Sequence, residues 1–369
     1  MNTGPLRLLD AEGNRVESDA TAEFAALAAS LSTETLLAMH REMVLTRRFD
    51  TEAGNLQRQG KLGLWVPSIG QEGGQVGAAF ALRPQDTTFP SYREHVVAHT
   101  RGVEFTQLMD VFRGAAHGGW DPKETQRFRI YSLVIGTQAL HSAGYAMGVA
   151  LDGKAATGNL ESDEAVLAFF GDGASSQGDV SEGFVFSASF NAPIVYFMQD
   201  NKWAISVPST TQFKTPMHER ARGFGLSSVW IDGNDPLIGF AATRTALDAA
   251  RQRKGPQFIE ADTYRIGAHT TSDDPTKYRS SDEVEVWRRR DPIVRMAAYL
   301  RSLGVAESTL AEIDTEAEDE AAAVRKHVLE APNPPSDIIF DHVYSDDHPL
   351  MNTQKRWLAE YERSFGDES

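Results

Sequence analysis

Two apolar runs, each ending in a short polar group, constrain the fold of this chain more than any other feature. The first run, Ala165 to Phe170, stops at Gly171-Asp172-Gly173; the second, Pro193 to Met198, stops at Gln199-Asp200-Asn201. Each has the length and flanking residues of a buried strand. If a helix joins two such parallel strands, Asp172 and Asn201 lie at the same carboxyl edge of a sheet, where open α/β sheets bind ligands.

The polar residues at that edge favour a diphosphate bridged to a metal ion. Asp172 offers a charged oxygen and Asn201 a neutral one, a combination suited to Mg²⁺. Gly171 and Gly173 allow a tight turn and a close approach of the backbone to a ligand. The connecting segment begins at residue 174, so free N–H groups at a helix start can face phosphate. The alternative is that Gly-Asp-Gly is only a turn and Asn201 only a loop residue.

The spacing of these residues resembles the thiamine diphosphate motif, in which GDG is followed at long range by asparagine. Asp172 and Asn201 lie 29 positions apart (201 − 172), each directly after an apolar run. The family usually ends the motif with two asparagines; the first is Asp200 here, while the second, its metal ligand, is retained as Asn201. By this resemblance the backbone carbonyl of Trp203 completes the metal site. The Walker pattern and the spacing of a dinucleotide fingerprint are absent.

A loop later in the chain extends the resemblance. YRIGAHTTSDDPTKYRS, residues 264–280, is similar to the mobile loop in the alpha subunit of two-oxoacid dehydrogenases, pyruvate and branched-chain alike. The resemblance implies that His269 lies near the diphosphate and assists reductive acylation of a lipoyl group. A histidine with its ordinary pKa near 6.5 can do so in either protonation state. A surface or capping role for His269 is the alternative. Thr270 stands where mammalian relatives carry a regulatory phosphoserine, which makes its phosphorylation a further hypothesis.

A tyrosine–arginine pair, Tyr92-Arg93, stands where the family grips the diphosphate, although it could also be a plain helix start. The planar fork of arginine can donate two hydrogen bonds to phosphate oxygens. Ile135 matches the bulky residue that holds the cofactor bent. The same resemblance implies that further residues surround the diphosphate, Gly173 and Ala174, and that others form an optional K⁺ site, Ser132, Thr137 and Gln138.

The resemblance runs from about Leu36 to Tyr344 and implies the alpha subunit of a two-oxoacid dehydrogenase of the pyruvate, acetyl-transferring type. Branched-chain (2-oxoisovalerate) and acetoin dehydrogenase alpha subunits are the near alternatives. The implied cofactors are thiamine diphosphate and Mg²⁺. The implied partners are a beta subunit in an α₂β₂ assembly, the lipoyl domain of an acyltransferase and a 2-oxo acid.

The family supplies the glutamate that activates the cofactor ring from the beta subunit. Glu72 of this chain is the candidate if that inference fails. Two more distant functions also remain open, a metal-dependent phosphohydrolase that uses Asp172 and a non-catalytic regulatory partner that keeps the fold.

Composition excludes several other classes. The 369 residues carry a net charge of −16, which disfavours nucleic acid and anionic membranes as partners. The chain has no cysteine, so disulfides and thiolate chemistry are absent. No apolar run approaches the roughly 20 residues of a membrane span, and the first residues lack a signal-peptide pattern. We therefore expect a cytoplasmic protein.

The predicted organisation is an α/β thiamine diphosphate-binding fold with a mostly parallel sheet flanked by helices. We expect a loosely structured N-terminal arm with a helix over residues 1–32, the α/β domain over 33–330 and a C-terminal tail over 331–369, with mostly helical structure from Pro292 onward. Apolar periodicity and capping residues also predict helices over 32–59, 103–112 and 237–253, and strands over 229–231 and 258–261.

Overall fold

The computed structural model describes residues 4–16, 18–116 and 119–366. It divides into two units, Met1–Val328 and Leu329–Ser369, and the first contains every predicted site residue. The three-part division expected from the sequence stays a prediction.

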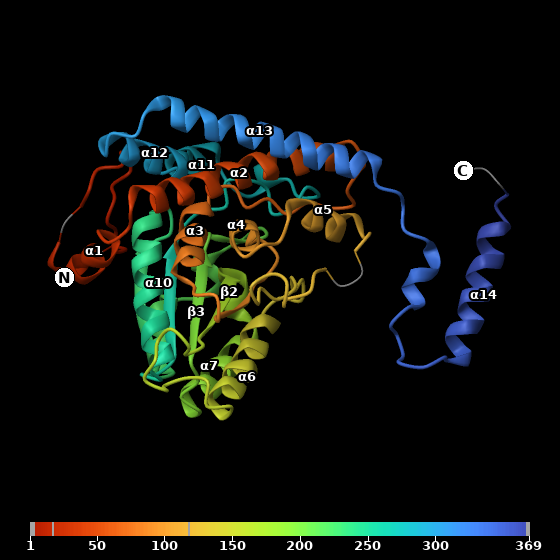
Figure 1. Ribbon diagram of the computed structural model, residues 1–369, viewed down its shortest axis with the longest axis horizontal. Coiled ribbons are helices and arrows are strands. Elements are labelled where there is room, and N and C mark those ends of the chain that lie inside the picture. Colours follow the sequence, from red (N-terminus) through yellow and green to blue (C-terminus); the bar gives the residue numbers. More distant parts are fainter. Residues whose placement is uncertain (1–3, 17, 117–118, 367–369) are drawn as a thin grey trace. The chain divides into compact units, whose positions relative to one another are not determined.

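A parallel sheet forms the centre of the first unit (Figure 1). Its strands follow the order β1 (Thr87–Phe89), β2 (Val166–Gly171), β3 (Ile194–Asp200), β7 (Gln257–Asp262) and β6 (Ser227–Asp232), and every neighbouring pair is parallel. The two apolar runs are therefore adjacent parallel strands, as predicted, with Gly171 opposite Gln199. The predicted strands near residues 230 and 260 are also confirmed, whereas the three-residue strand β1 was not predicted from the sequence.

Side chains of β2 and β3 alternate between two hydrophobic clusters, one on each face of the sheet. Leu167, Phe169 and Phe197 enter one cluster. Phe170 and Tyr196 enter the other, in which helices α6 (Thr137–Leu151) and α7 (Gly178–Ser189) also take part. Because both faces are covered, each strand is a nearly continuous apolar run, as is typical of parallel sheets.

The larger cluster receives side chains from most of the remaining helices. In Figure 1, helix α13 runs alongside α2, and ion pairs such as Arg41–Glu316 and Arg325–Glu52 join the two. The helices that begin in the first unit are α1 (Ala22–Ala28), α2 (Thr33–Arg58), α3 (Glu72–Ala81), α4 (His95–Thr100), α5 (Phe105–Arg113), α6 (Thr137–Leu151), α7 (Gly178–Ser189), α8 (Ser209–Gln212), α9 (Met217–Gly223), α10 (Pro236–Arg251), α11 (Ser281–Arg288), α12 (Pro292–Ser302) and α13 (Glu307–Glu330). Short 3₁₀ turns are η1 (Asp19–Thr21), η2 (Asp172–Ser176) and η3 (Pro275–Lys277).

Asp235 anchors the N-terminal arm, which is more ordered than the sequence predicted. Its Oδ1 caps α10 by accepting from Leu237 N at 2.9 Å, and Pro236 occupies the first helical turn. Its Oδ2 accepts from the backbone N of Leu8 at 2.6 Å and of Leu9 at 2.7 Å. The apolar side chains of Leu8 and Leu9 are fully buried. The expectation of a loose arm is therefore wrong, because a buried carboxylate satisfies its backbone.

Helix α3 lies in a stretch so rich in glycine that the sequence did not predict a helix there. Its glycines allow a close approach to α10: a Cβ on Gly77 would lie 2.5 Å from Phe240 N and 2.6 Å from Pro236 O. Close packing thus outweighs the low helix propensity of glycine. The same packing fixes Gln71, the residue before α3.

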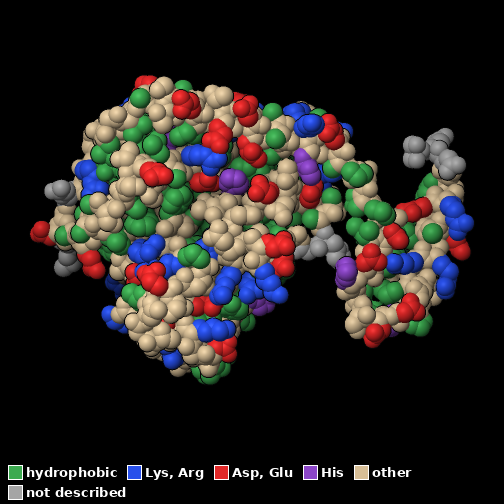
Figure 2. Space-filling model, viewed as in Figure 1, with side chains coloured by type: hydrophobic (Ala, Val, Ile, Leu, Met, Phe, Trp, Pro, Cys, Tyr) green, Lys and Arg blue, Asp and Glu red, His purple; other side chains and the backbone are tan. Residues whose placement is uncertain are grey.

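The second unit consists of η4 (Ser336–Phe340) and α14 (Pro349–Arg363). The two are joined by a hydrogen bond from Ser336 Oγ to Glu362 Oε2 at 2.9 Å and an ion pair between Lys355 and Asp341 at 2.9 Å. In Figure 2, acidic and basic side chains are interspersed over the visible face. Across the described part of the chain, no helix combines the length and apolarity needed to cross a membrane.

Candidate functional site

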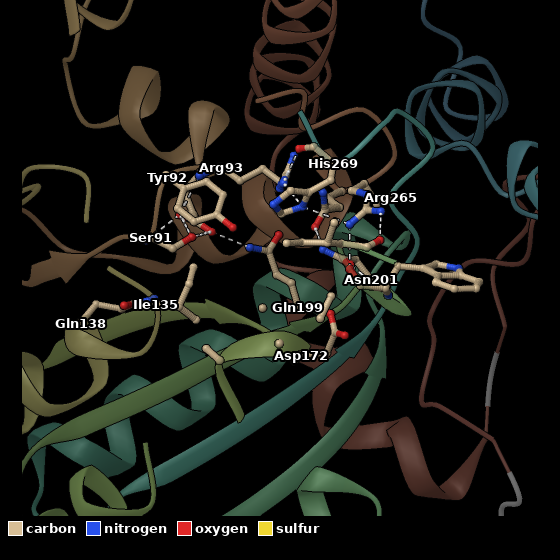
Figure 3. A pocket seen from close by; sticks show the side chains of 18 of the residues that line it. Ser91, Tyr92, Arg93, Ile135, Gln138, Asp172, Gln199, Asn201, Arg265 and His269 are labelled. Carbon is tan, nitrogen blue, oxygen red and sulfur yellow. Dashed lines mark hydrogen bonds between the residues drawn. The ribbon is translucent and has the colours of Figure 1, made fainter. Parts of the chain in front are cut away.

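A cavity of about 250 Å³ opens at the carboxyl edge of the sheet, beyond the ends of β2 and β3. Figure 3 shows side chains from several segments turned toward it. Every residue predicted to hold the cofactor or metal lines this cavity: Tyr92, Arg93, Ile135, Asp172, Gly173, Ala174, Asn201, Trp203 and His269. The structure thus brings together residues that lie up to 177 positions apart (269 − 92).

Three oxygens converge in the floor of the cavity. The side-chain oxygen of Asn201 faces Asp172 Oδ1 at 3.1 Å and the Trp203 carbonyl at 3.2 Å, both of which are acceptors. Among the described residues, the one donor to this oxygen is Trp203 N, at the long distance of 3.4 Å. Mg²⁺ holds oxygens at 2.0–2.1 Å, so neighbouring ligands of an octahedral ion lie about 3 Å apart. The spacing fits a cation between the three oxygens.

Exchange of the oxygen and nitrogen in the Asn201 amide offers the other way to satisfy this cluster. The nitrogen would then donate to Asp172 Oδ1 and to the Trp203 carbonyl. The arrangement therefore accommodates either a cation or two hydrogen bonds. No group of three or more acidic or histidine side chains suited to a metal occurs among the described residues, so this cluster depends on neutral oxygens beside one carboxylate.

The carboxyl group of Asp172 lies in an environment that resists its charge. Only 1% of the residue is exposed, and burial, followed by the negative charge of Asp200, raises the pKa of Asp172 to about 7. Gln212 Nε2 donates to its Oδ2 at 2.8 Å. A divalent cation would supply the positive charge that a carboxylate here lacks.

Gly173 is needed for close packing at the site. A Cβ on Gly173 would lie 2.9 Å from Cβ of Ala204, which belongs to a small hairpin of β4 (Trp203–Ala204) and β5 (Val207–Pro208). Without a side chain at 173, the hairpin lies directly over the turn after β2. This places the Trp203 carbonyl beside Asp172.

Two arginines bring buried positive charge to the wall of the cavity. Arg93 and Arg265 are 5% and 1% exposed, and no carboxylate of the described residues lies within ion-pair distance of either. Arg93 donates to the backbone carbonyls of Pro67 and His269. Arg265 donates to the carbonyl of Trp203 at 2.7 Å and of Ile205 at 2.8 Å. Burial, followed by the charge of Arg93, lowers the pKa of Arg265 to about 10. The cavity therefore favours an anion.

His269 lies between these two arginines. Its Nδ1 is 3.4 Å from Arg93 Nη2 and 3.3 Å from Arg265 Nη1. Guanidinium groups only donate, so Nδ1 accepts and the ring is neutral. Burial, then Arg93 and Arg265, lower the pKa of His269 to about 3. The sequence-based expectation of an ordinary pKa is wrong for the cofactor-free site, because two buried cations surround the ring.

The turn that carries Tyr92 and Arg93 is held by a buried carboxylate. Glu94 accepts from Ser91 N at 2.8 Å, from Ser91 Oγ and from Gln199 Nε2 at 2.7 Å. Gln75 Nε2 donates to Gln199 Oε1 and to the carbonyl of Arg93, both at 3.0 Å. These bonds connect the turn to the end of β3, two residues before Asn201.

Several residues of the cavity wall were missed by the sequence analysis: Gln71, Glu94, Gln199 and Arg265. Each lies within or beside one of the sequence motifs, but only the fold shows that its side chain is buried at the site. Glu72, the alternative to a beta-subunit glutamate for activation of the cofactor ring, does not line the cavity. It pairs with Arg47 and accepts from Gly70 N at 2.8 Å, so the structure contradicts that role.

The residues suggested for a K⁺ site lie at the start of α6. Ser132 Oγ and Thr137 Oγ1 are 2.7 Å apart, and Thr137 Oγ1 also donates to the carbonyl of Val134 at 2.9 Å. Oε1 of Gln138 is buried and has no partner among the described residues. Of the three residues, only Gln138 lines the cavity.

A parallel sheet with a cluster of oxygens and two arginines that make no ion pair with a described residue at its carboxyl edge defines an α/β protein with a polar ligand-binding cavity. The model of the dehydrogenase E1 component family matches residues 40–337. The chain belongs to this family, and within it to the alpha subunits of two-oxoacid dehydrogenases.

Relatives with two different substrates resemble the chain along most of its length. It is 42% identical to 3-methyl-2-oxobutanoate dehydrogenase subunit alpha of Mycobacterium tuberculosis over 330 residues, which cover 89% of this chain and 88% of the relative. It is 35% identical to pyruvate dehydrogenase E1 component subunit alpha of Acholeplasma laidlawii over 337 residues, covering 88% and 92%. The corresponding Staphylococcus aureus subunit is 35% identical over 302 residues, covering 81% and 77%.

Proposed function

We propose that this chain binds the diphosphate and metal of thiamine diphosphate and, with a beta subunit, catalyses oxidative decarboxylation of a 2-oxo acid and reductive acylation of a lipoyl group. Members of the E1 family depend on thiamine diphosphate in general. The observation that carries the proposal is the pairing, in one cavity, of the three-oxygen cluster with two unpaired arginines.

In this proposal Mg²⁺ is held by Asp172, Asn201 and the carbonyl of Trp203. The 3.1–3.2 Å separations between these oxygens match neighbouring positions around a small octahedral ion. Water and the diphosphate would complete the coordination, because Mg²⁺ is usually bound by few protein groups plus phosphates. Binding of the cation requires Asp172 in its charged form, since a carboxylate is the ligand.

The diphosphate is surrounded by Tyr92, Arg93, Arg265, His269 and the backbone of residues 173–174. Charge-assisted hydrogen bonds from a guanidinium to phosphate are stronger than neutral ones. The two arginines are buried without carboxylate partners, and an anion would supply the missing counter-charge. Ile135, 39% exposed at the cavity wall, would be the bulky apolar side chain that contacts the bound cofactor.

When bound, thiamine diphosphate would supply a nucleophilic carbon and an electron sink for decarboxylation of the 2-oxo acid. The chain's own groups orient it, neutralise its diphosphate and exclude water. His269 presents a neutral ring with its proton on Nε2, so it can donate a hydrogen bond from that atom. We propose that this group assists transfer of the acyl group to the lipoyl arm of an acyltransferase.

Ring activation needs a free carboxylate, and none of the described carboxylates that line the cavity is left free for this role. Glu94 lines the cavity but already accepts from Ser91 and Gln199, and Glu72 is paired with Arg47. We therefore propose that the beta subunit of an α₂β₂ assembly supplies the glutamate. Exposed apolar side chains support a covering partner: Ile135 and Ile205, which line the cavity, and Leu133, Val134 and Val207, which lie near them in the sequence.

The optional K⁺ and the phosphorylation of Thr270 are also proposals. The hydroxyls of Ser132 and Thr137 and the unpartnered Oε1 of Gln138 support the first. For the second, phosphopeptide mapping that finds the loop always unmodified would remove the hypothesis. Family membership excludes the phosphohydrolase alternative, whereas the acetoin dehydrogenase and regulatory alternatives await experiment.

The first experiment measures cofactor binding by thermal shift. Thiamine diphosphate with Mg²⁺ at 100 times the Kd should stabilise the chain by about 2.7 kcal/mol, whereas Asp172→Ala should show no such stabilisation. Asp172→Ala with intact decarboxylation in the reconstituted enzyme would favour a regulatory partner instead. Full turnover by the isolated chain would contradict the need for a beta subunit.

The substrate is settled by comparing rates with pyruvate and with 3-methyl-2-oxobutanoate (2-oxoisovalerate) in the αβ enzyme. The family resemblance includes both pyruvate and branched-chain subunits, and the relative that is 42% identical is named for the branched-chain acid. One methylene in an apolar pocket changes specificity by about 1–3 kcal/mol, so a clear preference should appear as at least about a tenfold difference in kcat/KM.

A further inference from the structure

Gln71 is buried beside the proposed metal site and contacts one of its ligands. The residue is 1% exposed and lines the cavity. Its Oε1 accepts from Asn201 Nδ2 at 3.1 Å. While Gln71 accepts this bond, the Asn201 oxygen is turned toward Asp172 Oδ1 and the Trp203 carbonyl, the orientation that a cation requires.

The same pair of amides has a second hydrogen-bonded arrangement. If oxygen and nitrogen exchange in both, Asn201 donates to Asp172 and to the Trp203 carbonyl, and Gln71 donates to Asn201. That arrangement presents a nitrogen where the cation would be coordinated. The choice between a metal-ready and a metal-blocked Asn201 therefore depends on whether residue 71 accepts or donates.

Hydrogen bonds and close packing hold the backbone around Gln71 in one conformation. Gln71 N donates to the carbonyl of Ser68 at 3.0 Å, and Ser68 N donates to the buried carboxylate of Asp50 at 2.7 Å. Gly70 adopts a φ of +98°, and a Cβ there would lie 2.5 Å from the carbonyl of Tyr264. The residue before Gln71 therefore cannot acquire a side chain without displacing the loop that bears His269.

We propose that Gln71 is the positioning residue that orients Asn201 for the metal ion. The inference rests on the proposed function, because it takes Asn201 as a ligand. Partners that orient a metal ligand usually contribute 10–100-fold to metal affinity. In the metal-ready arrangement Nε2 of Gln71 has no partner among the described residues, so it is available to donate to an oxygen of the bound ligand.

The test measures metal binding directly in the full chain assembled with its beta subunit. Mn²⁺ serves as the probe, because oxygen sites that bind Mg²⁺ also accept it, and free Mn²⁺ is counted by electron paramagnetic resonance at saturating thiamine diphosphate. Gln71→Leu removes the acceptor and should raise the Mn²⁺ Kd by about 10–100-fold. Gln71→Glu keeps an acceptor for Asn201 and should stay within about threefold of the wild type.

A matched control separates this effect from loss of folding. Gln85 also makes two side-chain hydrogen bonds to backbone carbonyls, those of Leu160 and Asp163, but it precedes β1 and does not line the cavity. Gln85→Leu should leave the Mn²⁺ Kd unchanged. The melting temperature of each metal-free variant shows whether it folds.

The outcomes distinguish this inference from the proposed function. If wild type binds Mn²⁺ and Gln71→Leu binds it equally well, Gln71 does not position Asn201. The same conclusion follows if Gln71→Glu weakens binding as much as Gln71→Leu. If the wild-type assembly binds no Mn²⁺ with thiamine diphosphate, the proposed function itself fails.

Discussion

The carboxyl edge of the sheet holds buried charges in both of its halves, and the halves differ in how those charges are partnered. Asp200, Asp262 and Asp232 end the strands β3, β7 and β6 and are register partners across them. Lys202 bridges Asp200 and Asp262. Arg295 and Arg290 pair with Asp232 at 3.1 and 3.2 Å.

The half beyond β2 and β3 holds charges without such partners. Asp172 makes no ion pair with any described residue, and the same holds for Arg93 and Arg265. All three line the cavity. Burial raises the pKa of Asp172 and lowers that of Arg265, whereas the pKa of Asp232 is lowered, because the pairing with Arg295 and Arg290 outweighs burial.

The difference separates a structural network from a binding site. A buried charge is costly unless it is paired, so a fold keeps unpaired ones where a ligand completes them. We call the half with Asp200, Asp232 and Asp262 the paired half, and the half that lines the cavity the unpaired half. In the paired half the protein provides every counter-charge. In the cavity a cation beside Asp172 and an anion beside the arginines would provide them.

The largest expected effect tests the paired half. Arg295→Met leaves Asp232 with Arg290 alone and should lower the free energy of unfolding by about 3 kcal/mol, because one member of a buried pair is lost. Urea titration of the metal-free chain measures this. The Kd for thiamine diphosphate with Mg²⁺ should not change in the folded fraction; a weakened Kd would mean that the two halves act as one site.

The reverse pattern is expected for the unpaired half. Arg93→Met removes a buried charge that makes no ion pair with a described residue, which offsets the loss of its bonds to the carbonyls of Pro67 and His269. The free energy of unfolding should therefore change by no more than about 1 kcal/mol. The affinity for thiamine diphosphate should fall by about 1.5–3 kcal/mol, the contribution of a hydrogen bond to a charged group. Calorimetric titration checks the affinity. Destabilisation as large as that of Arg295→Met would show that Arg93 is structural.

The sequence predicted the floor of the site because strand ends are local features. Asp172 and Asn201 directly follow apolar runs, and parallel pairing then places both at one edge. The pattern near His269 was found through a motif. Arg265 belongs to the same loop, but only the path of the loop back over β3 turns its guanidinium toward Trp203.

Long-range packing hides the remaining residues from sequence reasoning. Gln71 precedes helix α3, whose glycine-rich sequence is typical of a loop. That helix forms because it packs against α10. Glu94 meets Gln199 across 105 positions. No periodicity or spacing encodes such contacts, and the lowered pKa of His269 likewise depends on two arginines brought in from separate segments.

A smaller effect should appear in the pH dependence of stability. The pKa of His269 is lowered to about 3 in the folded chain, against about 6.5 when unfolded. Between these values the unfolded chain binds a proton that the folded chain excludes, so stability falls as pH falls. His269→Gln removes this penalty. Allowing for partial solvent exposure, the variant should gain about 1–2 kcal/mol relative to wild type between pH 7.5 and 4.5.

Melting curves of both proteins over that range provide the measurement. The difference in melting temperature, variant minus wild type, should increase toward acidic pH. A difference that stays constant would mean that the ring titrates with its ordinary pKa and is not held neutral by the arginines.

The smallest effect concerns Lys202, which lies at the boundary between the two halves. It follows Asn201 with a φ of +76°, a conformation that costs a non-glycine residue about 1 kcal/mol or more. Burial opposes its charge, but Asp200 and Asp262 hold the pKa of Lys202 above its usual range. Lys202→Met loses the bridge and keeps the strain, whereas Lys202→Gly loses the bridge and relieves it.

Both variants should be less stable than wild type, and Lys202→Gly should be the more stable of the two by about 1 kcal/mol. The left-handed turn also directs the Trp203 carbonyl toward Asp172, so the glycine variant tests whether the bridge holds that geometry. If Lys202→Gly folds but loses Mn²⁺ affinity, the paired half supports the metal ligand through this residue. If Mn²⁺ affinity does not change, the paired half does not support the metal ligand through Lys202.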